Sequence, residues 1–196
     1  MKQKSPSIRV APRVVLVFLL FLVTDRSGLV FVTLMAAFFH ELGHIFAARV
    51  LHVPFRQMRI DLMGARLEIG GRMLSYKEEW LLAMAGPLAS FLAAGVGLVF
   101  RELSELSLYF SCASLLLGGL NLLPIRSFDG GRMLEASVSS IAGARTAYRV
   151  MTLSSFFCLF LLWAVSVYFL LRVGDGISLF FFSLSLFLRF FEREKL

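Results

Sequence analysis

The sequence predicts an all-α polytopic membrane protein of about six transmembrane helices, with a small membrane-associated β-hairpin after the second. Of its 196 residues, 58% are apolar and 17% are charged, whereas a soluble domain has about 45–50% apolar and about 25% charged residues. The chain also holds 21 Phe residues and several near-continuous apolar runs, which a soluble domain of this length would expose in large patches. The composition therefore argues against a soluble globular domain, a disordered chain and a disulfide scaffold.

Six apolar runs account for the predicted helices. Three of them are long enough to cross the hydrocarbon unaided, since about 20 helical residues do so: Gly28–Leu51, Trp80–Phe100 and Met151–Leu171. Leu106–Leu123 is just long enough, and Val14–Val23 and Ile177–Leu188 have a length that suits either a span or an interfacial helix. Each short run spans only if it extends into its flank, the first through Ile8 and Val10 and the second through Phe190 and Phe191. The extension also requires Arg13 or Arg189 to reach the headgroups.

The Lys and Arg residues of the chain are concentrated in the segments that the six-span arrangement places on the cytoplasmic side. The formal net charge is +7, from 20 Lys and Arg against 13 Asp and Glu, which by itself would also suit a nucleic-acid-binding protein. With both termini on the cytoplasmic side, seventeen basic residues fall in cytoplasmic segments and only Arg26, Arg101 and Arg172 in outer turns. Cytoplasmic loops of membrane proteins carry this excess. We therefore expect a multi-pass protein with cytoplasmic termini and no nucleic-acid partner.

The long cytoplasmic stretch of residues 53–79 carries a strand pattern. Apolar and polar residues alternate before and after Gly64, and Gly70-Gly71 follows the second run. Alternation with a period of two around a glycine predicts a β-hairpin. Two roles suit such a hairpin: a ribbon that lies on the headgroups, or a strand edge that pairs with an extended peptide.

The second predicted span contains His40, Glu41 and His44 in the order His-Glu-Leu-Gly-His. Residues four apart share one face of a helix, so both imidazoles can bind a single metal ion. Glu41 lies about 100° round the helix, within reach of a water molecule at that metal. This is the spacing of zinc hydrolases. The alternative is a polar patch that joins helices, but ionisable groups within a span indicate a functional site because they cost several kcal/mol there.

A catalytic zinc takes three protein ligands and leaves one position for water, so a third ligand must come from elsewhere. Asp129 is the best candidate. Pro124 ends the fourth span, and we expect Gly130-Gly131 to let the backbone turn sharply so that Asp129 points into the bundle. An ordinary Asp-Gly turn is the alternative. Weaker candidates are an interfacial histidine and two carboxylates of the hairpin: His52, Asp61 and Glu68.

These motifs together resemble those of the site-2 proteases, zinc metalloproteases that cut substrates within or beside the membrane. The resemblance covers about residues 28–135 and joins His-Glu-Leu-Gly-His in one span to Asn-x-x-Pro-x-x-x-x-Asp-Gly-Gly after a later one. It implies one zinc ion per chain, bound by His40, His44 and Asp129, with Glu41 as the general base.

Two further features of the chain are interpreted through the same resemblance. It implies that Asn121 helps to position the substrate or the oxyanion, and that residues 53–79 are the family's strand-bearing loop. Gly86-Pro87 looks like the family's Gly-Pro-x-x-Asn element, in which Ser90 stands where many members have Asn.

Within that family, six spans and a short outer face look most like the sporulation-type proteases of endospore formers, which release a membrane-tethered sigma-factor precursor. We therefore expect residues 1–196 to form a single membrane-embedded metalloprotease domain without a PDZ or CBS domain. Its location would be a prokaryotic membrane. The expected partners are the lipid bilayer and a membrane-tethered protein or peptide substrate, and a membrane inhibitor or regulator is a further candidate.

Two other classes of function compete with proteolysis. A membrane metal-ion transporter would use the same His and Glu residues as a binding site, but it would carry polar residues along several spans. The first, fifth and sixth predicted spans hold few polar residues. A non-catalytic membrane regulatory subunit would have lost a metal ligand or the general base. Here all four candidate residues are present: His40, Glu41, His44 and Asp129.

Overall fold

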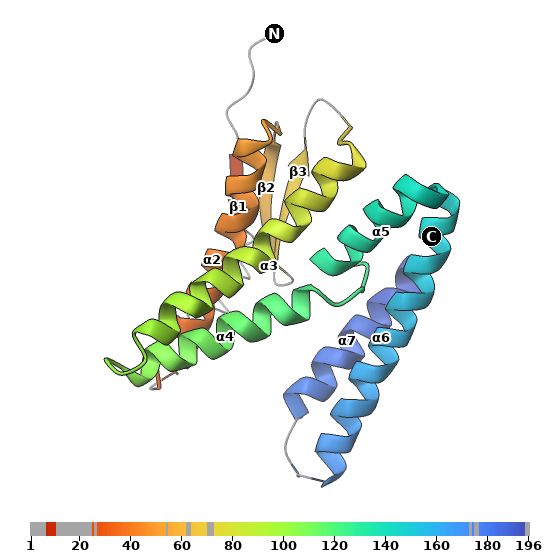
Figure 1. The fold of residues 1–196 in the computed structure, drawn as a ribbon. Helices are drawn as coiled ribbons and strands as arrows, with labels where there is room; N and C mark the ends of the chain where they lie inside the picture. The colour runs from red at the N-terminus through yellow and green to blue at the C-terminus, as the bar shows by residue number, and fades with distance from the viewer. Residues whose placement is uncertain are drawn as a thin grey trace. The chain divides into compact units, whose positions relative to one another are not determined.

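The chain is mostly helical where the computed structural model describes it, at residues 7–10, 25, 27–53, 55–61, 64–69, 73–172, 174 and 177–194. Figure 1 shows its elements in chain order: β1 (Ser7–Val10), α2 (Leu29–Val50), β2 (Phe55–Asp61), β3 (Gly64–Ile69), α3 (Tyr76–Val99), α4 (Glu105–Asn121), α5 (Asp129–Ala142), α6 (Ala144–Arg172) and α7 (Ile177–Glu194). These elements group into two compact units, residues 1–121 and residues 122–196.

Helix α2 begins just after a carboxylate that accepts hydrogen bonds from the start of the helix. The backbone N–H groups of Ser27 and Val30 donate to Asp25 at 2.9 and 2.7 Å. The Ser27 hydroxyl also donates to this carboxylate. The hydrogen bond from the hydroxyl is the largest cause that holds the pKa of Asp25 below its ordinary value, and the backbone N–H groups add to it. The carboxylate is therefore ionised at neutral pH, where its negative charge complements the positive end of the helix dipole.

One face of α2 is buried at every fourth residue. The buried side chains are Val32, Ala36, His40, His44 and Ala48, and this spacing keeps them on one side of a helix. Phe31 and Phe46, which lie off this face, are 57% and 71% exposed. Large apolar side chains that face outward in this way suit a lipid environment better than water.

Helices α2, α3 and α4 pack against one another in the first unit (Figure 1). Helix α3 starts with a capping box, in which the Ser75 hydroxyl accepts from the N–H of Glu78 and the Glu78 carboxylate accepts from the N–H of Ser75. Small residues dominate its buried side: Ala83, Gly86, Ser90, Ala94 and Gly97. Small side chains let neighbouring helices approach closely, as membrane helices do.

The segment for which the sequence predicts a hairpin holds strands β2 and β3. They pair antiparallel, with Asp61 opposite Gly64 at the turn. Strand β1 pairs with β2 in parallel, which makes the sheet order β1-β2-β3. The sequence did not predict β1, because four residues carry too short a pattern. Ile8 and Val10 therefore lie in a strand, so they do not lengthen the run Val14–Val23 as helical residues.

The second unit consists of α5, α6 and α7, with α6 packed against the other two (Figure 1). Ile125, Leu159 and Leu186 form its apolar core. The buried hydroxyls of Ser166 on α6 and Ser183 on α7 hydrogen-bond to each other at 3.0 Å. In such a pair one hydroxyl donates and the other accepts, and the bond joins two helices in an apolar setting.

Three helices of the described part are long and apolar enough to cross a membrane: α2, α3 and α6. Each covers all or nearly all of a run that the sequence predicts to span. Helix α4 has 17 residues, and the apolar stretch of α7 covers Leu179–Leu188. The first predicted span, Val14–Val23, lies outside the described residues. The structure thus supports a helical membrane protein in which three of the six predicted spans meet the length and composition of a membrane helix.

Helix α5 lies where the sequence analysis expected a cytoplasmic loop. Its residues are too polar for a membrane span, since Asp129, Arg132 and Glu135 occur within two turns. Helix α6 also begins earlier than the apolar run inside it, at Ala144 and not at Met151. Apolar runs alone reveal neither α5 nor the first turns of α6, because these segments are amphipathic or polar.

Candidate metal centre

The two histidines of the sequence motif face each other on the buried side of α2. The Nε2 atoms of His40 and His44 are 3.3 Å apart, and the ring planes meet at 79°. Both side chains are buried, with 4% and 6% of their surface exposed. The spacing of four residues therefore brings two imidazole nitrogens to one point inside the helical unit.

Helix α3 contacts the other nitrogen of each ring. The Nδ1 atom of His44 lies 2.8 Å from the carbonyl oxygen of Leu82, and the Nδ1 atom of His40 lies 2.9 Å from the Oγ atom of Ser90. A carbonyl oxygen can only accept, so His44 carries a proton on Nδ1. In the neutral ring, Nε2 then holds the lone pair. Histidines that bind metals almost always donate their second N–H in this way.

The separation of the two Nε2 atoms fits a shared zinc ion. Zinc binds histidine nitrogen at about 2.0–2.1 Å in tetrahedral geometry, which places two such ligands about 3.3 Å apart. The measured separation is 3.3 Å. Imidazole is also a ligand that suits zinc. The donor atoms and their distance therefore match this metal.

Gly86 of α3 leaves space beside the nitrogen pair. A Cβ atom at this position would lie less than 3.0 Å from the Nε2 atoms of both His40 and His44. Any larger residue would fill the space that the two nitrogens face. The glycine is needed here for the close approach of α3 to the imidazoles.

Glu41 follows His40 on α2 and is half-buried. It lies in a helix that is long and apolar enough to span a membrane, where an ionised carboxylate costs several kcal/mol. At about 100° from His40 round the helix, it stands beside the face that carries the imidazoles. A carboxylate in this place can exchange a proton with a molecule bound next to the two rings.

Asp129 is the first residue of α5, in the second unit. A carboxylate in the first turn complements the positive end of the helix dipole. The Asp-Gly pair thus begins a helix and does not form the ordinary turn that was the alternative.

The expected role of Gly130-Gly131 as a sharp turn is wrong, because both residues are helical and buried. A Cβ atom on Gly130 or Gly131 would come within 3.0 Å of the carbonyl oxygens of Leu122 or Ile125. The two glycines therefore allow the loop before α5 to pack closely against the first turn of the helix.

Helix α6 holds that loop in place. The backbone N–H of Arg126 donates to the Ser155 hydroxyl at 3.0 Å, and the Ser154 hydroxyl donates to the carbonyl oxygen of Pro124 at 3.1 Å. The Arg126 guanidinium also lies over the Tyr148 ring, 4.5 Å from its centroid. Hydroxyl groups within an apolar run give no sign in the sequence that they position a loop, so the sequence analysis missed them.

The remaining predicted residues have separate places. Asn121 is the last residue of α4, and its side-chain amide donates to the carbonyl oxygen of Leu117 at 2.9 Å. An amide has two N–H donors, so this bond leaves one for another acceptor. His52 is exposed in the turn after α2, with a φ of 52°, and lies off the face that carries His40. Asp61 and Glu68 lie in β2 and β3.

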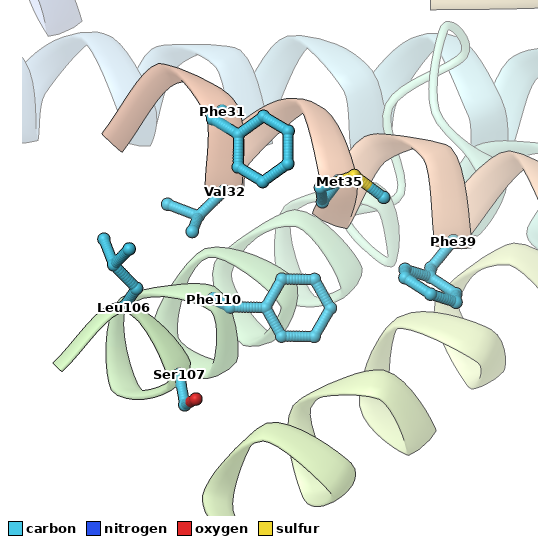
Figure 2. A pocket seen from close by; sticks show the side chains of 7 residues that line it. All are labelled: Phe31, Val32, Met35, Phe39, Leu106, Ser107 and Phe110. Carbon is cyan, nitrogen blue, oxygen red and sulfur yellow. The ribbon is translucent and has the colours of Figure 1, made fainter. Parts of the chain in front are cut away.

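A separate groove of 360 Å³ runs between α2 and α4. Figure 2 shows the side chains that line it: Phe31, Val32, Met35, Phe39, Leu106, Ser107 and Phe110. Phe39 and Phe110 meet edge to face, with ring centroids 5.8 Å apart. The lining offers one hydroxyl, that of Ser107, and no titratable group, so its chemistry suits apolar packing and not the binding of a metal.

The chain is similar to a peptidase family and to curated proteins that include zinc metalloproteases. The model of peptidase family M50 matches residues 99–165. Stage IV sporulation protein FB of Bacillus subtilis is 30% identical over 200 residues, which cover 95% of this chain and 67% of the relative. A zinc metalloprotease of Methanocaldococcus jannaschii is 34% identical over 115 residues, or 53% of this chain and 32% of that protein.

The fold is similar to that of a solved protease structure. The site-2 protease from Methanocaldococcus jannaschii matches with a TM-score of 0.65 over 98% of this chain and 92% of that chain. The two sequences are 22% identical, so this likeness concerns the arrangement of helices and strands.

Proposed function

The chain belongs to the site-2 protease family, peptidase family M50, and on this basis we propose that it cuts a membrane-associated protein precursor by zinc-dependent hydrolysis of a peptide bond. As a member of this family it is an intramembrane metalloprotease. The observation that carries the proposal is the pair of Nε2 atoms 3.3 Å apart on a helix apolar enough to span a membrane. It supports the proposal because imidazole nitrogens this close together suit a shared zinc ion, and the helix that carries them is apolar enough for the membrane.

His40 and His44 provide two zinc ligands in this proposal, and Asp129 provides the third. Support for His40 and His44 comes from their facing nitrogens and from the space that Gly86 leaves beside them. Support for Asp129 comes from its carboxylate, a ligand type that zinc accepts, and from the Asn-x-x-Pro-x-x-x-x-Asp-Gly-Gly pattern around it. When bound, zinc lowers the pKa of a water molecule to about 7 and polarises a carbonyl oxygen.

Glu41 acts as the general base. Its carboxylate takes a proton from the attacking water as the oxygen of that water bonds to the scissile carbonyl carbon. It then delivers the proton to the amide nitrogen as the C–N bond breaks, so that a carboxylic acid and an amine result. The second N–H of Asn121 donates to the substrate or to the developing oxyanion.

The substrate is a membrane-tethered protein, and its cleaved segment must be extended because a helical peptide bond has its carbonyl shielded. The sheet β1-β2-β3 offers a strand edge that can pair with such a segment. One relative is named for a stage of sporulation, and a sigma-factor precursor is the substrate that we propose from this likeness. Residues 1–196 would act as one multi-pass domain with both termini in the cytoplasm and with a membrane inhibitor or regulator as a further partner.

Replacement of Glu41 tests the mechanism. In a reconstituted membrane containing a tethered precursor, we expect Glu41→Gln to abolish measurable cleavage while one zinc per chain remains bound. A loss of at least about 100-fold is expected, because general base catalysis contributes 10²–10⁴-fold. The matched control is Glu102→Gln, because Glu102 is an exposed carboxylate that pairs with Arg101. This variant should cleave the precursor as the unmodified chain does. Cleavage at the full rate by Glu41→Gln would exclude this role.

A further inference from the structure

Ser90 is fully buried and lies next to one of the two imidazoles. Its exposed fraction is 0%, and its Oγ atom is 2.9 Å from the Nδ1 atom of His40. The two residues are 50 positions apart in the chain and belong to α3 and α2. A hydroxyl that is buried at hydrogen-bond distance from a ring nitrogen restricts how that ring can turn.

The direction of this hydrogen bond follows from the chemistry of the ring. If His40 binds a metal through Nε2, a neutral imidazole must carry its proton on Nδ1. The Nδ1–H group then donates, and the Ser90 hydroxyl, which can accept as well as donate, receives the bond. The Ser90 hydroxyl thus accepts a hydrogen bond from Nδ1–H of His40, as the carbonyl oxygen of Leu82 accepts one from Nδ1–H of His44.

Packing keeps the Ser90 side chain in this position. A Cβ atom on Gly118 of α4 would lie 3.0 Å from the Cβ atom of Ser90, so α4 closes tightly over Ser90 from one side. Gly86, one turn earlier on α3, brings the same helix close to the two Nε2 atoms. One face of α3 therefore contacts both nitrogens of the His40 ring, and the Ser90 hydroxyl lies against that ring.

We propose that Ser90 is a positioning residue for the metal centre: it accepts a hydrogen bond from His40 Nδ1–H and so holds the Nε2 atom toward that of His44. This inference rests on the proposed zinc protease function and adds a residue to it. Partners of this kind fix the tautomer and orientation of a ligand, and their loss typically lowers metal affinity 10- to 100-fold.

Zinc affinity, measured on the purified full chain in detergent by competition with a chromophoric chelator, tests the proposal. We expect Ser90→Ala to weaken zinc binding about 10- to 100-fold. We expect Ser90→Thr, which keeps the hydroxyl, to bind within about 3-fold of the unmodified chain. Ser111→Ala is the matched control, because Ser111 is equally buried but donates to the carbonyl oxygen of Ser107 in its own helix. It should leave the affinity unchanged.

A second measurement reports on ligand geometry without any substrate. The visible absorption bands of the cobalt-substituted protein depend on the ligands and their angles, so they should shift in Ser90→Ala and return in Ser90→Thr. Unchanged zinc affinity in Ser90→Ala would overturn the proposal, as would an equal loss in Ser90→Thr or in Ser111→Ala. If the unmodified chain binds no zinc, or if His40→Ala binds it equally well, the proposed metal site fails instead.

Discussion

At the scale of single residues, the proposed metal centre depends on nitrogens whose orientation is set by contacts with another helix. Helix α2 places His40 and His44 on one face, but each side chain can still rotate about its Cα–Cβ and Cβ–Cγ bonds. The contacts of their Nδ1 atoms with Ser90 and Leu82 of α3 remove that freedom. Rings that are oriented before the metal arrives lose less conformational entropy when they bind it.

Gly86→Ala is expected to lower zinc affinity about 10-fold or more, because the added Cβ atom would lie less than 3.0 Å from both Nε2 atoms. Chelator competition measures this loss. The matched control is Gly95→Ala on the same helix, where an added Cβ atom meets nothing within 4 Å and the alanine favours the helix by about 1 kcal/mol. Zinc affinity that stays the same in both variants would contradict the assigned role of Gly86.

At the scale of elements, α6 supports the loop before α5 as well as being long and apolar enough to cross a membrane. Its first turns hold the segment that leads to Asp129, through the hydroxyls of Ser154 and Ser155 and through the Tyr148 ring. The first turn of α5 packs against the same segment at Gly130 and Gly131. The start of α5 is therefore supported from two helices of its own unit, which keeps the carboxylate of Asp129 at a defined place in that unit.

Ser155→Ala is expected to loosen this segment. The backbone N–H of Arg126 would lose its acceptor, and a hydrogen bond of this type is worth about 0.5–1.5 kcal/mol. Amide hydrogen exchange in residues 122–128 should therefore become about 2- to 10-fold faster, as measured by mass spectrometry of peptides from this segment. In the control Ser140→Ala, which removes a hydroxyl bonded only within α5, exchange in the segment should be unchanged. Equal exchange in Ser155→Ala and in the unmodified chain would rule out the anchoring role.

At the scale of the whole molecule, the proposed zinc ligands come from both units, since His40 and His44 belong to residues 1–121 and Asp129 to residues 122–196. Each unit also exposes many large apolar side chains, among them Phe46, Leu116 and Phe157. Such surfaces are stable in a bilayer and would associate in water. The proposed enzyme therefore needs the membrane both as the solvent of its helices and as the place of its substrate.

Asp129→Ala is expected to weaken zinc binding at least about 100-fold, because it would remove one of three protein ligands. Zinc content and chelator competition measure this on the purified chain. Asp61→Ala removes the same group from β2 and should leave the affinity as it is. If Asp129→Ala bound zinc with full affinity, the third ligand would have to be assigned to another residue.

Local patterns predicted part of the fold and the pairing of His40 with His44 on one face of α2, while the roles of the site residues stay predictions. The apolar runs correspond to α2, α3 and α6, and the alternating segment corresponds to β2 and β3. The same kind of reasoning missed β1, which is too short to carry a pattern, and α5, which is too polar for a span. It also misjudged Gly130-Gly131, because a glycine needed for close packing and a glycine needed for a turn look the same in a sequence.

The sequence by itself determined the class of protein and the shared face of His40 and His44 on α2, with Glu41 beside it, because apolar length and helical spacing are local properties of a chain. The tertiary structure alone decided what holds the imidazoles. Leu82 contributes a backbone carbonyl, and any residue has one, so no pattern of side chains can reveal it. Ser90 is 50 positions from His40, and only the packing of α3 against α2 brings its hydroxyl to the ring.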